Sequence, residues 1–241
     1  MSSGQTAVVW GASGGIGRAL VEALQASSRY AVIHAGSRAA VPAASDIVRP
    51  FAFDLGDESS IAAAAEVLAL TGPADLTFVA TGILHGAGYQ PERSFAELTP
   101  EAMMALYRVN AVGPALIAKH MIQALPRDRR SVFAALSARV GSIGDNRLGG
   151  WHSYRASKAA LNMVIANLAI ELSRTRPLAI AVGLHPGTVE TSLSAPFQKA
   201  VAPGMLLTPS ASAQHLLFVM DGLTNQASGS VMAWNGQQIT P

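Results

Sequence analysis

The chain has 241 residues, of which 50% are hydrophobic and 13% charged, and this length is sufficient for one α/β domain with a sizeable core. Its 17 Lys and Arg nearly balance its 15 Asp and Glu, so the formal charge of +2 gives no sign of a nucleic-acid-binding surface. The absence of Cys excludes disulfides, thiolate metal sites and Cys nucleophiles.

The low charged fraction also bears on assembly and location. It is about half the usual share, so we expect part of the surface to be covered by other subunits, in a homodimer or homotetramer. No apolar run approaches the roughly eighteen residues that span a bilayer, and residues 1–6 are short and polar. We therefore expect a cytoplasmic, soluble protein without membrane contact.

A strand is predicted over residues 6–10, followed at once by a glycine turn and a helical pattern. The turn contains Gly11, Ser13, Gly15, Ile16 and Gly17. Residues without Cβ let the backbone approach a diphosphate, whose charge then lies at the positive N-terminus of the helix. The pattern predicts a dinucleotide site, and its alternative is a glycine-rich turn without a ligand.

The second predicted strand, residues 30–35, is followed by Gly36, Ser37 and Arg38. A chain that binds NAD usually places an acidic residue here to hold the adenosine ribose. The uncharged Ser37 leaves room for a 2′-phosphate, and Arg38 supplies a cation with planar donors. The segment favours NADP over NAD, the alternative being a surface Arg on a loop.

A third strand is predicted over residues 47–53, with Asp54 and Leu55 at its end. Asp54 would meet the adenine edge, and it could also cap the helix that follows. An Ala-rich helix over 57–70 and a strand over 74–81, ending before Gly82, come next. This alternation predicts a parallel, doubly wound sheet covered on both faces.

After a polar connection, a helix is predicted from residue 100 to residue 125. Asn110 lies in its middle, where an amide is mildly unfavourable, so this side chain is expected to have a specific task. A strand over 131–136, a Gly-rich loop and a helix containing Tyr154 follow.

The sixth strand, residues 178–184, precedes Pro186, Gly187, Val189 and Thr191. The irregular stretch 192–208 contains several apolar residues and is the best candidate for a flexible substrate lid. A helix over 209–221 and a strand over 230–233 complete the sheet. We find no linker or repeat, so residues 1–241 are expected to form a single domain.

Tyr154 and Lys158 are four residues apart and share one face of a helix. A nearby ammonium group lowers the pKa of a phenol, which can then exchange protons near neutral pH. The spacing alone is a weak signal, and its alternative is a half-buried Tyr beside a solvated Lys.

Taken together, these motifs resemble the short-chain dehydrogenase/reductase family in their order and intervals. They are Gly11-x-x-x-Gly15-x-Gly17, Asp54-Leu55, Asn110, a Ser after the fifth strand, Tyr154-x-x-x-Lys158 and Pro186-Gly187-x-Val189-x-Thr191. The segment 137–162 is similar to the carbonyl-reductase and C-signal-like branch. The resemblance implies a single Rossmann domain with a mostly parallel sheet of about seven strands.

The resemblance also implies roles for individual residues. Tyr154 would exchange a proton with the substrate oxygen, Lys158 would hold the nicotinamide ribose, and Asn110 would position a water. Pro186 and Gly187 would shape the backbone around the nicotinamide, with Val189 in the same motif, and Thr191 would bond its carboxamide. The family usually has Asn-Asn-Ala-Gly after the fourth strand, whereas this chain has 79–82 as Val-Ala-Thr-Gly, so Thr81 and Gly82 are expected to contact the cofactor through the backbone.

The family's catalytic Ser precedes a Gly by three residues, which places it at Ala138 in this chain. Ser137 lies one residue earlier, and a shift of one residue at a strand end can turn a side chain to the opposite face. We predict Ser137 in this role, with Ser142 as its substitute.

The sequence as a whole predicts an oxidoreductase that uses NADP (NADPH) and a small carbonyl or alcohol substrate. The alternative is a signalling or regulatory protein on the same fold that binds NADP with little turnover. His85, His152 and His185 are interpreted as packing or hydrogen-bonding residues near the site, and no metal site is predicted.

Overall fold

Eight strands form the central sheet of the computed structural model, which describes residues 4–39 and 45–241. Their order across the sheet is β3-β2-β1-β4-β5-β6-β9-β10, and every neighbouring pair is parallel except β9 with β10. The strands are β1 Gln5–Trp10, β2 Tyr30–Ser37, β3 Val48–Ala52, β4 Leu76–Val79, β5 Ser131–Leu136, β6 Ala179–His185, β9 Val231–Ala233 and β10 Gln238–Ile239. The predicted doubly wound, mostly parallel Rossmann fold is confirmed.

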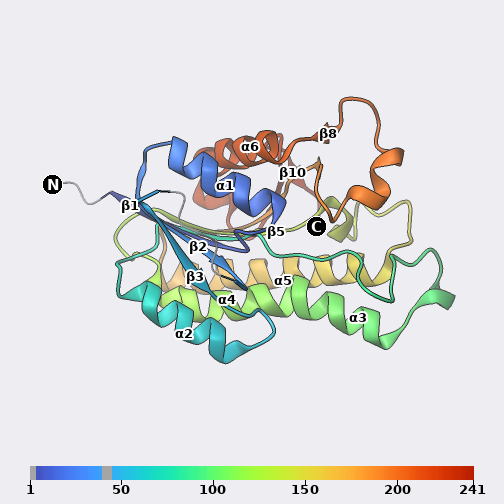
Figure 1. The fold of residues 1–241 in the computed structure, drawn as a ribbon, viewed down its shortest axis with the longest axis horizontal. Helices are drawn as coiled ribbons and strands as arrows, with labels where there is room; N and C mark the ends of the chain where they lie inside the picture. The colour runs from blue at the N-terminus through green and yellow to red at the C-terminus, as the bar shows by residue number, and fades with distance from the viewer. Residues whose placement is uncertain (1–3, 40–44) are drawn as a thin grey trace.

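Helices cover both faces of this sheet, and the two layers are separate in Figure 1. Helices α1 (Gly15–Ala26) and α6 (Pro209–Gly222) lie above the sheet in that view. Below it lie α2 (Glu58–Ala69), α3 (Pro100–Tyr107), α4 (Gly113–Met121) and α5 (His152–Thr175). Among the described residues, no helix combines the length and the apolar character that crossing a membrane requires.

Side-chain alternation along the strands supplies a core to each layer. In β5, Val132, Ala134 and Leu136 pack toward α1 and α6, while Phe133 and Ala135 pack toward the helices on the other face. Strands buried on both faces need apolar residues at successive positions, which is why these segments appear in the sequence as continuous apolar runs.

The helix predicted over residues 100–125 is interrupted. After α3 the chain makes a π-helical turn over Arg108–Val112, then α4, and then a 3₁₀ turn over Ile122–Ala124. A π turn inserts one residue into a helix, and such turns are frequent at functional sites. Asn110 lies within it, so the predicted position in the middle of a regular helix is wrong in detail.

The cap of α2 is Asp57, and the alternative prediction that Asp54 caps this helix is wrong. The Asp57 carboxylate accepts a hydrogen bond from the Ser59 amide at 2.9 Å. Asp54 instead accepts one from the Gly56 amide at 2.8 Å, within the turn that follows β3. Because capping requires the residue directly before the first helical turn, the helix start at Glu58 decides between the two.

Candidate active site

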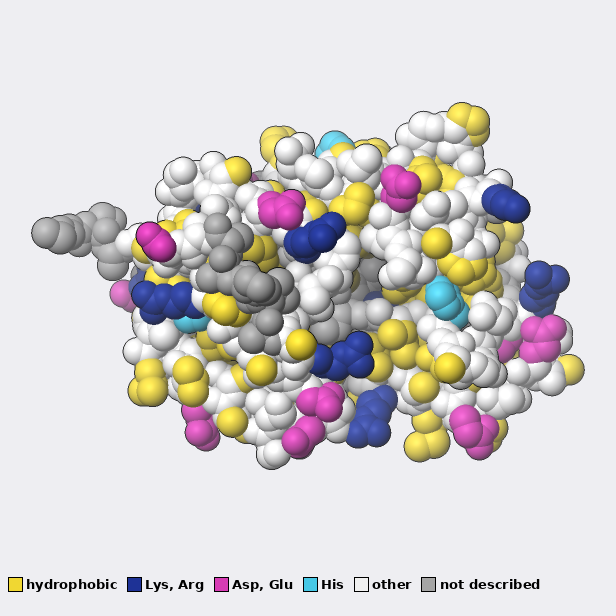
Figure 2. All heavy atoms as spheres, in the orientation of Figure 1, with side chains coloured by type: hydrophobic (Ala, Val, Ile, Leu, Met, Phe, Trp, Pro, Cys, Tyr) yellow, Lys and Arg dark blue, Asp and Glu magenta, His cyan; other side chains and the backbone are white. Residues whose placement is uncertain are grey.

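A cavity of about 300 Å³ opens at the carboxyl ends of the central strands, where the strand order reverses between β1 and β4. In Figure 2 this face of the molecule is hollowed near its centre. Open parallel sheets bind ligands at this position. Its wall includes the predicted residues Gly15, Ile16, Thr81, Gly82, Ser137, Tyr154, Lys158, Pro186, Gly187, Val189 and Thr191.

The glycine turn after β1 is packed so closely that side chains would not fit. A Cβ on Gly17 would lie 2.2 Å from the carbonyl oxygen of Gly11, and one on Gly15 would lie 2.8 Å from Cγ2 of Thr191. Gly11 itself has a φ of +94°, in the region that favours glycine. Gly17 therefore lets α1 pack closely on the turn at Gly11, and Gly15 brings the start of α1 close to Thr191, after β6.

Among the described residues, no side chain caps the N-terminus of α1. Gly14 is the N-cap residue, and the first turn contains no acidic residue. The first amides of a helix have no partner within it, and the helix dipole makes this end favourable for an anion. With Gly15 and Ile16 on the cavity wall, and Ser13 in the same turn, the site fits the diphosphate of a dinucleotide.

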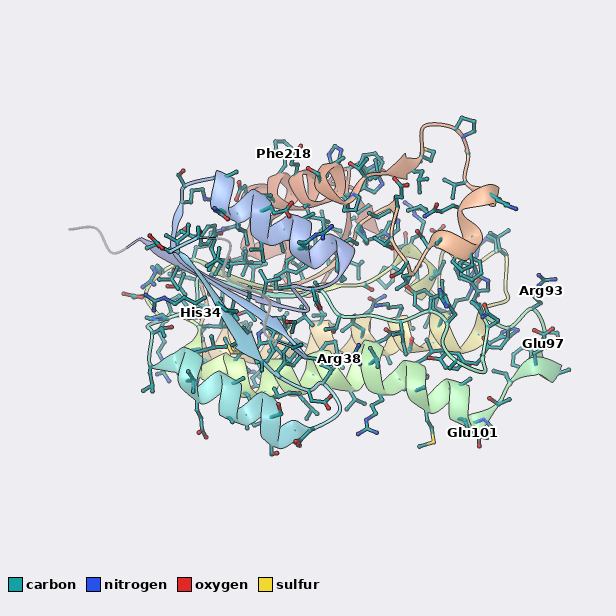
Figure 3. All side chains as sticks on the ribbon, in the orientation of Figure 1. His34, Arg38, Arg93, Glu97, Glu101 and Phe218 are labelled. Carbon is teal, nitrogen blue, oxygen red and sulfur yellow. The ribbon has the colours of Figure 1, made fainter. Side chains whose placement is uncertain are left out.

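Ser37 and Arg38 lie at the carboxyl end of β2, outside the wall of the cavity. Ser37 is buried and its hydroxyl donates to the Ala39 carbonyl, whereas Arg38 is exposed at the strand end, as labelled in Figure 3. Asp54 is also exposed, just after the end of β3. Leu55 packs closely against Gly113, where an added Cβ would lie 2.6 Å from Cγ of Leu55. The described part of this region therefore includes the exposed Arg38 cation and the exposed Asp54 carboxylate.

Asn110 joins three parts of the site. Its side-chain amide donates to the Ile83 carbonyl and accepts from the Ile83 amide, both at 2.9 Å, and also donates to Ser157 at 3.0 Å. It thereby fixes the segment after β4 to helix α5. A Cβ on the adjacent Gly82 would lie 3.6 Å from Nζ of Lys158, so the fixed backbone and the Lys are close neighbours.

Tyr154 and Lys158 lie together on the cavity wall, as their spacing predicts. Tyr154 is 8% exposed and Lys158 is 3% exposed, and Nζ of Lys158 lies 5.8 Å from the centre of the Tyr154 ring. The ammonium donates to the Leu136 carbonyl at 2.8 Å. The two side chains therefore face one space from the first two turns of α5.

Burial decides the pKa values of this pair. It raises the pKa of Tyr154 above its ordinary value and lowers the pKa of Lys158 to about 7. The prediction that the ammonium lowers the pKa of the phenol is therefore wrong for the chain alone. The consequence is a phenol that keeps its proton at neutral pH.

The low pKa of Lys158 predicts a pH dependence of stability. The folded amine loses its proton near pH 7, whereas the unfolded one keeps it up to about 10.5. The unfolded state thus carries more protons between these values, and stability rises with pH there. We expect Lys158→Met to flatten the rise of the unfolding free energy between pH 7 and 10, measured by urea denaturation. The exposed Lys119→Met is the control, and parallel curves for wild type and Lys158→Met would contradict the assignment.

The predicted serines are placed differently. Ser137 lies on the cavity wall, but its hydroxyl donates to Oδ1 of Asn162 at 2.5 Å. Ser142 is buried outside the wall, where its hydroxyl accepts from the Asp145 amide at 2.9 Å. Ala138 is on the wall and has no hydroxyl. Ser142 is therefore not placed to substitute for the family serine.

Apolar residues form the far side of the cavity. The Trp151 and Phe197 rings are 5.1 Å apart, and the His85 ring lies 5.9 Å from that of Phe197. The stretch 192–208 contributes Leu193 and Phe197 to the wall, and it is less irregular than predicted. It contains a 3₁₀ turn, Ala195–Ala200, and the short strand β8 (Leu206–Leu207), which pairs with β7 (Thr188–Val189).

The start of α5 is held by a residue that the sequence analysis missed. Glu92 is 3% exposed, and its carboxylate accepts from the backbone amide of Ser153 at 3.2 Å and from the Ser153 hydroxyl. Its carbonyl accepts from the Trp151 amide at 2.5 Å. Glu92 thus caps the helix that carries Tyr154 through bonds to a residue 61 positions away, and no local pattern marks it.

The three histidines near the site differ in their surroundings. His85 bonds the Leu193 carbonyl at 3.2 Å, and the His152 ring stacks at 4.2 Å on that of Phe95. His185 lies on the cavity wall. Across residues 4–39 and 45–241, no three His, Asp or Glu side chains gather as metal ligands.

Comparison with known proteins gives a consistent result. The family described as short chain dehydrogenase has a model that matches residues 5–211. C-signal of Myxococcus xanthus is 33% identical over 138 residues, which are 57% of this chain and 77% of that protein. The 1-hydroxy-2-glutathionyl-2-methyl-3-butene dehydrogenase of Rhodococcus sp. strain AD45 is 34% identical over 149 residues, or 61% of this chain and 62% of that one.

Among solved structures, the NADPH-bound carbonyl reductase from chicken fatty liver superposes with a TM-score of 0.82. The match covers 99% of this chain and 94% of the reductase at 22% sequence identity. At that identity the likeness establishes the fold.

Proposed function

The chain belongs to the short-chain dehydrogenase family, and from this premise we propose that it is an NADP(H)-dependent oxidoreductase acting on a small carbonyl or alcohol. The observation that supports this best is one cavity wall that contains Tyr154, Lys158 and the uncapped start of α1. The predicted resemblance to carbonyl reductases and C-signal agrees with the relatives found.

In this proposal each side chain has a defined task. The nicotinamide supplies the hydride when bound. The Tyr154 phenol, which burial keeps protonated, gives its proton to the substrate oxygen as negative charge develops there. Lys158 holds the ribose hydroxyls and replaces the proton, and Asn110 keeps the segment at Gly82 and Ile83 in place beside it.

The fourth task, a hydrogen bond to the substrate oxygen, is the one that the sequence assigns to Ser137. Its hydroxyl donates to Asn162, so it would have to leave that bond to serve the substrate. The remaining cofactor contacts that we propose are those of the glycine turn, Asp54, Leu55, Thr81 and the segment from Pro186 to Thr191.

We further propose that Arg38 selects NADP over NAD by binding the 2′-phosphate. Arg38→Ala is expected to weaken NADPH binding about 10- to 100-fold, since hydrogen bonds to charged groups contribute about 1.5–3 kcal/mol. NADH binding should be unchanged. Both dissociation constants can be measured by cofactor fluorescence, with the exposed Arg174→Ala as the control. An equal loss for both cofactors would refute the selection.

The proposed activity is tested by following NADPH oxidation with purified protein against aldehydes, ketones and quinones. Turnover that requires Tyr154 supports the oxidoreductase. Tight NADPH binding without turnover, on this panel and on one of bulkier carbonyls, would favour the regulatory alternative, in which the cofactor is bound and sensed.

Assembly and location complete the proposal. We propose a single domain with 192–208 as a substrate lid, in a cytoplasmic homodimer or homotetramer. Large apolar side chains that are exposed on the helices support association: Met163 and Ile170 on α5 are 62% and 53% exposed, and Phe218 on α6, labelled in Figure 3, is 81% exposed.

A further inference from the structure

We propose that the His185 imidazole, through its Nε2–H group, donates the hydrogen bond to the substrate oxygen that a serine provides in the family pattern. This inference rests on the proposed function and adds a catalytic residue to it. It concerns the position directly before Pro186, at the end of β6.

Strand geometry places His185 on the catalytic side of the sheet. In β6, Ala179 and Ala181 pack in the core beneath α5, and because side chains alternate, Gly183 and His185 face the same way. That face is covered by the helix that carries Tyr154 and Lys158. His185 is therefore directed toward the side of the cavity where the proton donor lies.

Register places His185 beside Ser137, one residue before the position where the family serine is expected. Leu136 of β5 pairs with Leu184 of β6, and the Ser137 amide donates to the Leu184 carbonyl at 2.8 Å. The next residues along the two strands are thus neighbours, at the spacing of about 5 Å that separates adjacent strands. Ala138, the family serine position, follows Ser137 directly and lines the same cavity as His185.

Neither nearby serine nor Ala138 supplies a free donor. The Ser137 hydroxyl is engaged with Asn162 at 2.5 Å, and Ser142 lies outside the cavity wall. Of the polar side chains on this part of the wall, Tyr154 is needed for the proton and Lys158 donates to the Leu136 carbonyl. Thr81 and Arg139 also line the wall, but Oγ1 of Thr81 is enclosed and Arg139 is paired with Asp145 at 3.0 Å. The partly exposed His185 ring can offer an N–H donor from the end of β6.

The surroundings of the ring select which nitrogen holds the proton. Nδ1 is enclosed and has no hydrogen-bond partner among the described residues, so a proton there would be a buried donor without an acceptor. Nε2 is not enclosed in this way, and the ring is partly exposed on the cavity wall. The proton is therefore favoured on Nε2, the nitrogen that can reach a ligand.

Charge and burial keep this ring neutral at physiological pH. Burial, with a smaller effect from the nearby Arg139 cation, lowers the pKa of His185 to about 4. The other titratable side chains that line this cavity are Tyr154, Lys158 and Arg139, and none of them is a carboxylate. A neutral imidazole donor, unlike a cation, leaves the phenol as the acid that delivers the proton.

The tautomer can be measured without any substrate. We expect long-range ¹H–¹⁵N correlation spectra of the full chain at pH 7 to report a neutral His185 ring protonated on Nε2. The His185→Gln spectrum assigns the signals. A ring protonated on Nδ1, or a charged ring, would overturn the proposal, because Nε2 would then be an acceptor or the ring a competing acid.

Kinetics test the role in catalysis, with 4-nitrobenzaldehyde and the fastest substrate of the carbonyl panel as probes. We expect His185→Ala to lower kcat roughly 10²- to 10³-fold with a small change in KM, since the bond strengthens as charge develops on the oxygen. His185→Gln, which restores an N–H donor, should recover part of kcat. Ser137→Ala should lower kcat much less.

The outcomes separate this proposal from the proposed function. Full activity of His185→Ala, in a protein that Tyr154→Phe inactivates, would overturn the role of His185 and leave the oxidoreductase intact. A larger loss in Ser137→Ala than in His185→Ala would assign the contact to the serine. Activity that survives Tyr154→Phe would overturn the proposed function itself.

Discussion

Tyr154→Phe is expected to lower the rate of NADPH-dependent carbonyl reduction by about 10²- to 10⁴-fold, the contribution typical of a positioned general acid. The variant removes one hydroxyl from a ring that packs against Leu84 and Leu106, so the fold should be retained. NADPH binding should also be retained, because the groups proposed to bind it, the glycine turn, Lys158 and Arg38, are unchanged. The result is a variant that binds the cofactor but cannot protonate the substrate oxygen.

Tyr89→Phe is the matched control for this experiment. Tyr89 packs beside the same small apolar cluster but lies outside the cavity wall. It should therefore leave both kcat and KM unchanged. Steady-state rates at 340 nm and NADPH fluorescence titrations measure the two properties separately. Equal rates for wild type and Tyr154→Phe would exclude the phenol as the acid.

Gly17→Ala is expected to destabilise the protein and to weaken NADPH binding at least tenfold. Its Cβ would lie 2.2 Å from the Gly11 carbonyl oxygen, a backbone atom that can move only if the turn moves. Overpacking of this kind costs about 1–3 kcal/mol, which corresponds to a fall in Tm of roughly 3–10 °C for a chain of this size. The displaced turn would no longer present the amides of α1 to a diphosphate.

Gly14→Ala provides the control within the same turn. Its Cβ would have only the Gly11 carbonyl oxygen nearby, at 3.5 Å, and its φ of −74° suits any residue. Thermal unfolding should therefore give a Tm close to that of the wild type. Similar Tm values for all three proteins would mean that the close contact at Gly17 is not what shapes the turn.

Much of the fold could be predicted because its signals are local. The apolar run at 131–136, the glycines after residue 10 and the pairing of Tyr154 with Lys158 each follow from neighbouring residues. The doubly wound, mostly parallel sheet follows as well, since strands that alternate with helices favour parallel pairing. The strand β10, only two residues long and antiparallel, carries no pattern long enough to detect.

The errors concern features that depend on distant residues. The π turn at Asn110 inserts one residue, and the bonds to Ile83 that accompany it join segments 27 residues apart. The pKa direction of Tyr154 is set by burial, which comes from chain segments distant in sequence. The Ser137 bond to Asn162 spans 25 residues, so the strand pattern could place the serine without revealing that its hydroxyl was engaged.

Hydride transfer is the central claim, and the most direct test uses NADPH deuterated at the transferable position of C4. With a carbonyl substrate from the panel, the wild-type protein should give an alcohol that contains one deuterium, detected by mass spectrometry. Tyr154→Phe should form this product at least a hundredfold more slowly. Tight NADPH binding by wild type with no deuterated alcohol from any carbonyl tested would contradict the oxidoreductase and favour a protein that senses the cofactor.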